Sequence, residues 1–200
     1  MLSCADEPEV TEEVWSLYMG SFTDPERIPR GNLDRALSAG GFLHVFRNKG
    51  DFIGFAYGFS NSGIAFLVYL ATVPEVRGRG YGKEMLALLR SMHPDERIFL
   101  VTEMCNESAD DFGMRVRRQD YYLRNGCSRT GCTVITDGVE MDTMAVQGEL
   151  SADEMAGAVR FYEDVHNGRL RALGQGSSPS SDVRVNVPVN LDRCGERSHL

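Results

Sequence analysis

The sequence predicts an α/β (α+β) fold in which a mixed, mostly antiparallel central sheet is flanked by helices. Apolar runs rich in aromatic and β-branched residues alternate with short turns of hairpin chemistry, a pattern typical of neighbouring antiparallel strands. Other segments repeat apolar residues at helical spacing behind a capping residue. Because 42% of the 200 residues are hydrophobic, we expect one domain with a substantial core.

Two helices are predicted near the start of the chain. Thr11 can cap the first, which carries Val14 and Tyr18 on one face. A turn over residues 25–29 precedes a short second helix that begins near Asn32. The first six or so residues precede any predicted element, and we expect them to be mobile.

Six strands are predicted along the chain. Turn residues at 48–51 and 61–63 join the first three strands into an antiparallel meander. Asp137-Gly138, the strongest two-residue hairpin signal in the chain, joins the last two. The predicted strands are 42–47, 52–59, 64–73, 97–103, 128–136 and 139–147.

Two capping patterns predict further helices. Ser108 with Asp111 resembles a capping box, and a helix over 109–124 would follow it. Ser151 with Glu154 forms a second capping box before a clear apolar stripe. This final helix should end at the next Asn-Gly pair, because glycine commonly terminates helices.

The composition changes near the C-terminus. From residue 174 onward, Gly, Ser, Pro, Asn and Arg dominate, and little apolar surface remains to offset the entropy cost of ordering. We therefore expect a domain over 1–150, a C-terminal helix within 151–173 and a disordered tail over 174–200.

The overall composition argues against several classes of function. A net charge of −8 opposes nucleic-acid binding, which requires a basic surface. The apolar runs fall far short of the roughly 20 residues that cross a bilayer, and no signal-type segment opens the sequence, so we expect a cytoplasmic protein. Five cysteines without a CxxC pair and four scattered histidines predict no metal site.

The most informative stretch runs from the strand 64–73 through Arg77-x-x-Gly80-x-Gly82 into a helix. Gly78, Gly80 and Gly82 have no β-carbon and permit positive φ, so consecutive backbone N–H groups can turn toward one anion. The N-terminus of the following helix adds unpaired N–H groups and the positive end of its dipole. Together these features predict a pyrophosphate site.

Other phosphate loops fit this stretch poorly. A Walker A loop is excluded because Lys83 is followed by Glu84, and a dinucleotide fingerprint would need glycine or alanine at the position of Lys83. A flexible strand-to-helix connection remains the alternative explanation of the glycines.

Arg77, Gly80 and Gly82 match the signature of the GNAT superfamily of acyl-CoA N-acyltransferases, which the sequence therefore resembles. That signature is a strand followed by Arg or Gln-x-x-Gly-x-Gly or Ala. The resemblance covers roughly residues 10–147 in the order of elements.

A second motif supports the resemblance. Residues 121–127, Tyr-Tyr-Leu-Arg-Asn-Gly-Cys, look like the aromatic-Tyr-x-x-x-Gly-aromatic segment of the family, with Cys127 in place of the usual Phe. The Asn-x-x-Ala of many members is absent, since residues 115–118 occupy that region. Three arginines there, Arg115, Arg117 and Arg118, are equally compatible with a solvated helix face.

The resemblance implies a splay between the fourth and fifth strands of the family, here 64–73 and 97–103, with acetyl-CoA between them. Strand backbone would bind pantetheine, and loop N–H groups would bind the pyrophosphate. The implied cofactor-binding residues are Leu70, Ala71, Thr72, Arg77, Gly78, Arg79, Gly80, Tyr81, Gly82 and Lys83. Acetyl-CoA serves as a co-substrate, and no metal is implied.

Acetyl transfer to an amine needs a neutral nucleophile, stabilisation of the oxyanion and a proton for the departing thiolate. By resemblance, Tyr122 would protonate or hydrogen-bond the CoA sulfur; its ordinary alternative is a packed aromatic at a helix end. Glu103, at a strand end, could accept the ammonium proton, or be a plain surface carboxylate. The amide of Leu70 would donate to the thioester carbonyl.

Four charged residues stand where the family builds its acceptor pocket, and their alternative explanation is ordinary exposed surface charge: Glu12, Glu13, Glu26 and Arg27. The resemblance implies an N-acetyltransferase that acts on a primary amine by direct attack in a ternary complex. Alternatives are a non-catalytic CoA-binding regulatory module of the same fold, and a transferase using a longer acyl donor or an alcohol acceptor. A homodimer is compatible with the sequence.

Overall fold

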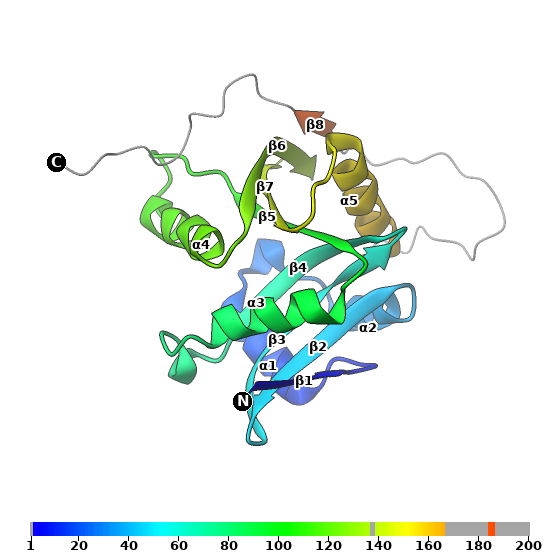
Figure 1. The fold of residues 1–200 in the computed structure, drawn as a ribbon, viewed down its shortest axis with the longest axis vertical. Helices are drawn as coiled ribbons and strands as arrows, with labels where there is room; N and C mark the ends of the chain where they lie inside the picture. Colours follow the sequence, from blue (N-terminus) through cyan, green and yellow to red (C-terminus); the bar gives the residue numbers. More distant parts are fainter. Residues whose placement is uncertain (1, 137–138, 167–183, 187–200) are drawn as a thin grey trace.

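The computed structural model describes residues 2–136, 139–166 and 184–186, which form one eight-stranded sheet with helices on both faces (Figure 1). The strand order is β1-β2-β3-β4-β5-β7-β6-β8. The strands are β1 (Leu2–Asp6), β2 (Gly41–Asn48), β3 (Asp51–Asn61), β4 (Ile64–Thr72), β5 (Arg97–Glu103), β6 (Ser128–Thr136), β7 (Val139–Gln147) and β8 (Arg184–Asn186). The helices are α1 (Glu12–Ser21), α2 (Arg30–Leu37), α3 (Tyr81–Met92), α4 (Phe112–Arg124) and α5 (Ala152–His166), with 3-10 turns η1 (Asp24–Glu26) and η2 (Pro74–Val76).

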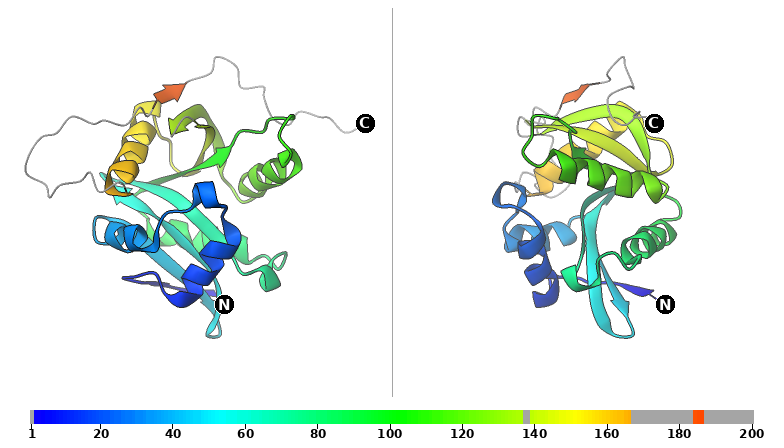
Figure 2. Two further views of the ribbon diagram at one scale, coloured as in Figure 1. Left: turned by 180° about the vertical axis from the view of Figure 1, so that it is seen from behind. Right: turned by 90° about the vertical axis from the view of Figure 1, so that its left-hand side faces the viewer.

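The helices divide between the two faces of the sheet (Figure 2). Ala65 and Leu67 of β4 pack in the same cluster as the apolar side chains of α3, on the face that α4 also covers. Phe66, between them, points to the opposite face and packs with α5. The helices α1 and α2 cover the rest of that second face.

The predicted fold class is confirmed, and local signals account for much of it. All neighbouring strands are antiparallel except β4 and β5. Lys49 and Gly50 close the β2–β3 hairpin with φ of 53° and 93°, as a turn with two left-handed residues requires. Ser151 and Glu154 make the predicted capping box at the start of α5. Asp137-Gly138 lies outside the described residues.

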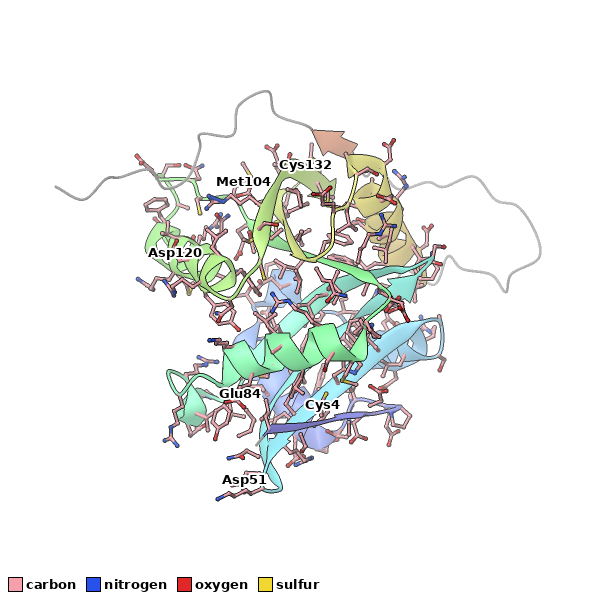
Figure 3. The ribbon with its side chains drawn as sticks, in the orientation of Figure 1. Cys4, Asp51, Glu84, Met104, Asp120 and Cys132 are labelled. Atoms are coloured by element: carbon pink, nitrogen blue, oxygen red, sulfur yellow. The ribbon has the colours of Figure 1, made fainter. Side chains whose placement is uncertain are left out.

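The N-terminal residues, which the sequence led us to expect as mobile, form the strand β1 instead. Their pairing with β2 runs from Leu2 opposite Asn48 to Asp6 opposite His44. Leu2 is buried, and Cys4 packs against the core beneath α3 (Figure 3). The expectation was wrong because the free edge of β2 supplies the backbone partners that this short segment needs.

The helix α4 begins at Phe112, three residues later than predicted. The proposed capping box does not form, because Ser108 donates its N–H and its hydroxyl to Asn106 Oδ1 in a local turn. Asp111 binds Arg115 Nε at 2.7 Å instead of capping the helix through its side chain. Asn106 thus accepts the Ser108 N–H that the side chain of Asp111 would accept in the predicted capping box.

Three residues of the predicted tail form the strand β8. This strand pairs antiparallel with β6, with Arg184 opposite Ile135 and Asn186 opposite Thr133. The edge of β6 offers unpaired backbone groups to this Val-containing segment. The remaining residues of that predicted tail, and the predicted end of α5, lie outside the described residues.

Two histidines that are far apart in the sequence meet beneath β1. The Nε2 atoms of His44 and His93 are 2.8 Å apart, and both rings are buried. His44 Nδ1 lies 2.5 Å from Asp6 Oδ1, and His93 Nδ1 contacts Glu96. This network ties β1 to the C-terminal end of α3.

No helix in the described ranges has the length and apolar character needed to span a membrane.

The stability of the fold should fall as the pH drops through the range in which His166 titrates. Burial lowers the pKa of His166 from its ordinary 6.5 to about 4, with Arg35 adding to the effect and the Tyr162 carbonyl opposing it. Between these two values the unfolded chain binds a proton that the folded chain excludes, so acid favours unfolding. We expect this histidine to account for a loss on the order of 1–3 kcal/mol at about pH 4.

Urea unfolding of the wild type and of His166→Gln, at neutral pH and at pH values down to about 4, isolates this contribution from that of the carboxylates. The variant should lose less stability on acidification than the wild type. Parallel losses in the two proteins would contradict the assignment.

Candidate functional site

The strands β4 and β5 separate part-way along their length. Their parallel pairing runs only from Ile64 opposite Arg97 to Leu67 opposite Leu100. Beyond that point β4 stays paired with β3 as far as Thr72, and β5 stays paired with β7. The register of β3 and β4 also shifts here, leaving one extra residue on β4. Such a bulge bends a strand, so the two strands diverge into a splay.

A cleft of about 650 Å³ opens at this splay. Its wall consists of the end of β4, the glycine loop, the first turn of α3 and one side of α4. The lining residues are Leu70, Ala71, Thr72, Val76, Arg77, Gly78, Gly80, Tyr81, Gly82, Lys83, Arg118, Tyr121, Tyr122, Arg124 and Asn125. The volume and the mixed polar and apolar lining suit an extended small-molecule ligand.

The backbone of β4 presents hydrogen-bonding groups to the cleft. Val73 N donates to Ile53 O of β3 at 2.9 Å, and hydrogen-bonding direction alternates along a strand. Ala71 therefore faces β3 as well, whereas Leu70 and Thr72 face the splay. The Thr72 carbonyl accepts from Arg77 Nε at 3.2 Å, so the groups that remain for a ligand are the amides of Leu70 and Thr72 and the carbonyl of Leu70.

The glycine loop supplies a set of unpaired N–H groups next to the same cleft. Gly78 and Gly80 have φ of 76° and 86°, and Gly80 caps α3. Among the described residues, the amides of Gly78, Gly80, Tyr81 and Gly82 donate to no protein acceptor. Converging N–H groups at a helix N-terminus form an anion site.

Gly82 does not adopt the positive φ that the sequence predicted for it. Its φ is not positive, since it lies in the first turn of α3. A β-carbon at Gly82 would stand 2.5 Å from the hydroxyl oxygen of Tyr121. The glycine therefore allows α4 to pack closely against the start of α3, while Gly78 and Gly80 provide the left-handed turns.

Two adjacent tyrosines of α4 lie in the cleft wall. The rings of Tyr121 and Tyr122 meet edge to face, with centroids 5.1 Å apart. Burial raises the pKa of Tyr122 to about 12, and the nearby Arg118 opposes this only in part. Tyr122 is consequently protonated at neutral pH and can donate a proton or a hydrogen bond.

The end of α4 is held in place by an arginine from α3. Arg90 donates to the carbonyls of Asn125 and Val146 at 2.9 and 3.0 Å, and to Cys127 Sγ at 3.6 Å. Cys127 is buried in the core beside α3. The tyrosines of α4 thus stand in a fixed position relative to the anion loop.

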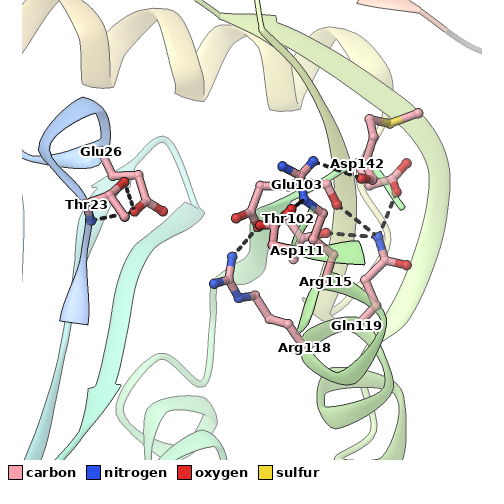
Figure 4. Close-up of polar contacts among 10 residues, drawn as sticks. Thr23, Glu26, Thr102, Glu103, Asp111, Arg115, Arg118, Gln119 and Asp142 are labelled. Carbon is pink, nitrogen blue, oxygen red and sulfur yellow. Dashed lines mark hydrogen bonds and ion pairs between the residues drawn. The ribbon is translucent and has the colours of Figure 1, made fainter. Parts of the chain in front are cut away.

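A charged pair stands where β5 ends. Glu103 accepts a hydrogen bond from Arg118 Nη1, and Figure 4 shows Arg118 reaching from α4 to make this contact. Burial lowers the pKa of Arg118, but Glu103 raises it more, with smaller effects from Tyr122 and Glu26. Glu26 lies across the splay from the pair (Figure 4), so three charged side chains surround this part of the site.

The profile of the acetyltransferase (GNAT) family matches residues 9–115, more than half of the chain. The chain belongs to this family. No match was found among curated proteins. Three solved structures show the same fold at low sequence identity.

A GNAT-family protein from Bacteroides thetaiotaomicron has a TM-score of 0.59 and 21% identity, covering 78% of this chain and 87% of its own. A Bacillus subtilis acetyltransferase solved in complex with CoA has a TM-score of 0.55 and 14% identity, covering 74% and 99%. The ribosomal-protein-S18-alanine N-acetyltransferase of Escherichia coli has a TM-score of 0.55 and 14% identity, covering 76% and 96%.

Not every residue predicted for this GNAT site lies in the cleft wall. Arg79 is exposed and is not among the lining residues. Arg27 donates to the carbonyls of Phe22 and Met19 and pairs with Asp24 at 2.6 Å, which ties η1 to the end of α1. Its expected role in acceptor binding stays a prediction.

The remaining acidic residues of the expected acceptor pocket also have local partners. Glu26 Oε2 accepts from the N–H and hydroxyl of Thr23, each at 2.7 Å. Glu12 pairs with Arg30 at 2.5 Å, and Glu13 pairs with Arg47. Figure 4 shows Glu26 across the gap from Glu103 and Arg118, and its expected role in acceptor binding stays a prediction.

Several lining residues of the GNAT cleft were not predicted as site residues: Val76, Arg118, Tyr121, Arg124 and Asn125. Three of the five belong to α4 and Asn125 is its C-cap, and their helical spacing around Tyr122 was the available signal. Within the described ranges no group of three or more His, Cys, Asp or Glu side chains is arranged to hold a metal ion.

Replacing Gly82 with Ala should destabilise the fold. The new β-carbon would overlap the Tyr121 hydroxyl, and overpacking of this kind costs about 1–3 kcal/mol. The helix-propensity gain is smaller, because Gly82 lies in the first turn and the gain of about 1 kcal/mol applies to a helix interior. Urea unfolding measures the change. Adding Tyr121→Phe to Gly82→Ala should recover part of the loss, because it removes the nearest atom.

Gly157→Ala in α5 is the matched control, since a β-carbon there meets no atom within 4 Å. It should leave stability unchanged or raise it by up to about 1 kcal/mol. The packing assignment fails if Gly82→Ala behaves like Gly157→Ala.

Proposed function

We propose that this chain is an N-acetyltransferase that moves the acetyl group of acetyl-CoA to a primary amine by direct attack in a ternary complex. The observation that carries the proposal is one cleft that combines unpaired loop amides, outward-facing strand amides and a protonated tyrosine. An anion site alone would suit many ligands. The added strand edge and proton donor suit a phosphorylated thioester that must be held, polarised and cleaved.

The geometry of the cleft supports one position for acetyl-CoA. The pyrophosphate would lie against the amides of Gly78, Gly80, Tyr81 and Gly82, with Arg77 and Lys83 beside it. The pantetheine arm would run along β4 like an added strand, using the outward-facing backbone of Leu70 and Thr72, with Ala71 between them held by β3. The CoA bound by the Bacillus subtilis acetyltransferase of the same fold supports this choice of donor. Arg79 would contribute charge from outside the cleft wall.

The reaction assigns one task to each polar group at the splay. Glu103 would accept a proton from the ammonium group of the acceptor, which frees the nitrogen lone pair to attack the thioester carbonyl carbon. The amide of Leu70 would donate to the carbonyl oxygen while it carries negative charge. As the carbon–sulfur bond breaks, Tyr122 would give its proton to the thiolate sulfur. The nitrogen, positively charged once its bond to carbon has formed, would lose its second proton, which returns Tyr122 to the neutral form. The products are an N-acetylated amine and CoA, and one proton is released to water overall.

The acceptor is proposed only as a class. Glu26 on the splay and the acidic balance of the chain favour an amine that approaches as a cation. The Escherichia coli enzyme of the same fold is named for acetylating an alanine of ribosomal protein S18, which supports an amine acceptor. Arg27, on the same side as Glu26, would support the acceptor wall through its contacts with α1.

Replacing Tyr122 with Phe tests the chemical assignment. Phe keeps nearly all of the packing but has no proton to give, and a positioned general acid contributes about 10² to 10⁴ in rate. We expect kcat to fall at least tenfold while the Kd for acetyl-CoA and the Tm stay near wild type. Intact-mass analysis of products from an amine mixture, with CoA release as the rate, provides the readout.

Tyr121→Phe is the internal control for this experiment. The two rings point in different directions from the helix, and Tyr121 faces Gly82, so its substitution should have the milder effect on kcat. Tight acetyl-CoA binding without any turnover by the wild type would favour the non-catalytic module instead. Equal, unchanged kcat in both variants would show that the thiolate leaves without help from either tyrosine.

A further inference from the structure

Arg118 lines the cleft, and its ion-pair partner Glu103 stands beyond the lining residues at the end of β5. The helix α4 runs from the end of β5, where Arg115 donates to the Met104 carbonyl, to α3, where Arg90 binds the Asn125 carbonyl. Near the end of this path, the Tyr121 side chain packs against α3 at Gly82. Arg118 and Glu103 stand at the β5 end.

The helix provides a measure of distance within the cleft. Arg118 precedes Tyr122 by four residues, so both side chains project from one face and their backbones are separated by roughly 6 Å along the axis. If the CoA sulfur lies at Tyr122, the acyl group beyond it points toward Arg118. An acetyl group has a single carbon beyond the carbonyl, and each further methylene extends a chain by roughly 1.3 Å. A medium-length chain would therefore meet the ion pair.

The chemistry of the pair opposes an apolar chain. The side chains of Arg118 and Glu103 keep 37% and 22% of their accessible surface, so water still solvates both charges. A methylene chain laid against them would displace this water without replacing its hydrogen bonds, which is costly for ionised groups. The charge of Glu26 has a further, smaller effect on Arg118 across the splay.

We infer that the Arg118–Glu103 ion pair limits the acyl donor to short chains. The inference rests on the proposed function, since it places the thioester sulfur at Tyr122. It assigns to Arg118 a task that a solvated helix arginine does not have. Arg117, its exposed neighbour on α4, is not among the lining residues and supplies the comparison.

Competition between acetyl-CoA and octanoyl-CoA for one amine measures this limit directly. In Arg118→Ala, the ratio of kcat/KM for octanoyl-CoA to that for acetyl-CoA should rise at least tenfold over wild type. It should stay unchanged in Arg117→Ala and close to wild type in Arg118→Lys, which retains the cation. A change of this size in the kcat/KM ratio lies within the range by which apolar contacts discriminate between substrates.

A uniform fall in kcat for both donors, with the ratio unchanged, would overturn the inference and assign Arg118 to the positioning of Glu103. Thermal shifts provide a readout that does not need turnover: octanoyl-CoA should raise the Tm of Arg118→Ala, and of the larger Arg118→Met, more than it raises that of wild type. Equal shifts would also overturn the inference. Failure of acetyl-CoA to stabilise the wild type would instead reject the proposed function itself.

Discussion

The divergence of β4 from β5 beyond Leu67 and Leu100 is the constraint on which the rest of the site depends. Each strand remains held on its other side, by β3 or by β7, so the divergence is a stable part of the sheet. It leaves amides of β4 without a strand partner. Buried backbone groups need partners, so the arrangement is stable only because these amides face a cleft that water or a ligand can fill.

Backbone groups and side chains have different roles around this cleft. Backbone amides from β4, the glycine loop and α3 supply the binding groups, which makes their geometry a property of the fold. Side chains of α4 and β5 supply the proton donor and the charged pair. Arg90 links the two sets, because it reaches from α3 to the carbonyl after α4 and to β7. The distance between anion loop and tyrosines therefore depends on one buried contact network.

Local signals in the sequence predicted those structural features that depend on residues close together in the chain. The β2–β3 hairpin, the cap of α5 and the glycine loop all follow from residues a few positions apart. The strand β1 was missed because its stability comes from the edge of β2, about 40 residues away. The same limit explains why Gly82 was assigned to the loop: its partner, Tyr121, comes from a different helix. The Arg118–Glu103 contact likewise joins α4 and β5, and no local signal in the sequence indicates that these two elements meet.

The most direct test of a ligand site in the splay is an amide-resolved NMR titration of the ¹⁵N-labelled chain with CoA. The amides of Gly78, Gly80, Tyr81 and Gly82 should shift together with those of Leu70 and Thr72, because all face the cleft. Ala71, whose backbone faces β3, should shift less than its two neighbours. Saturable shifts confined to another part of the sheet, with these amides unchanged, would contradict the placement of the ligand.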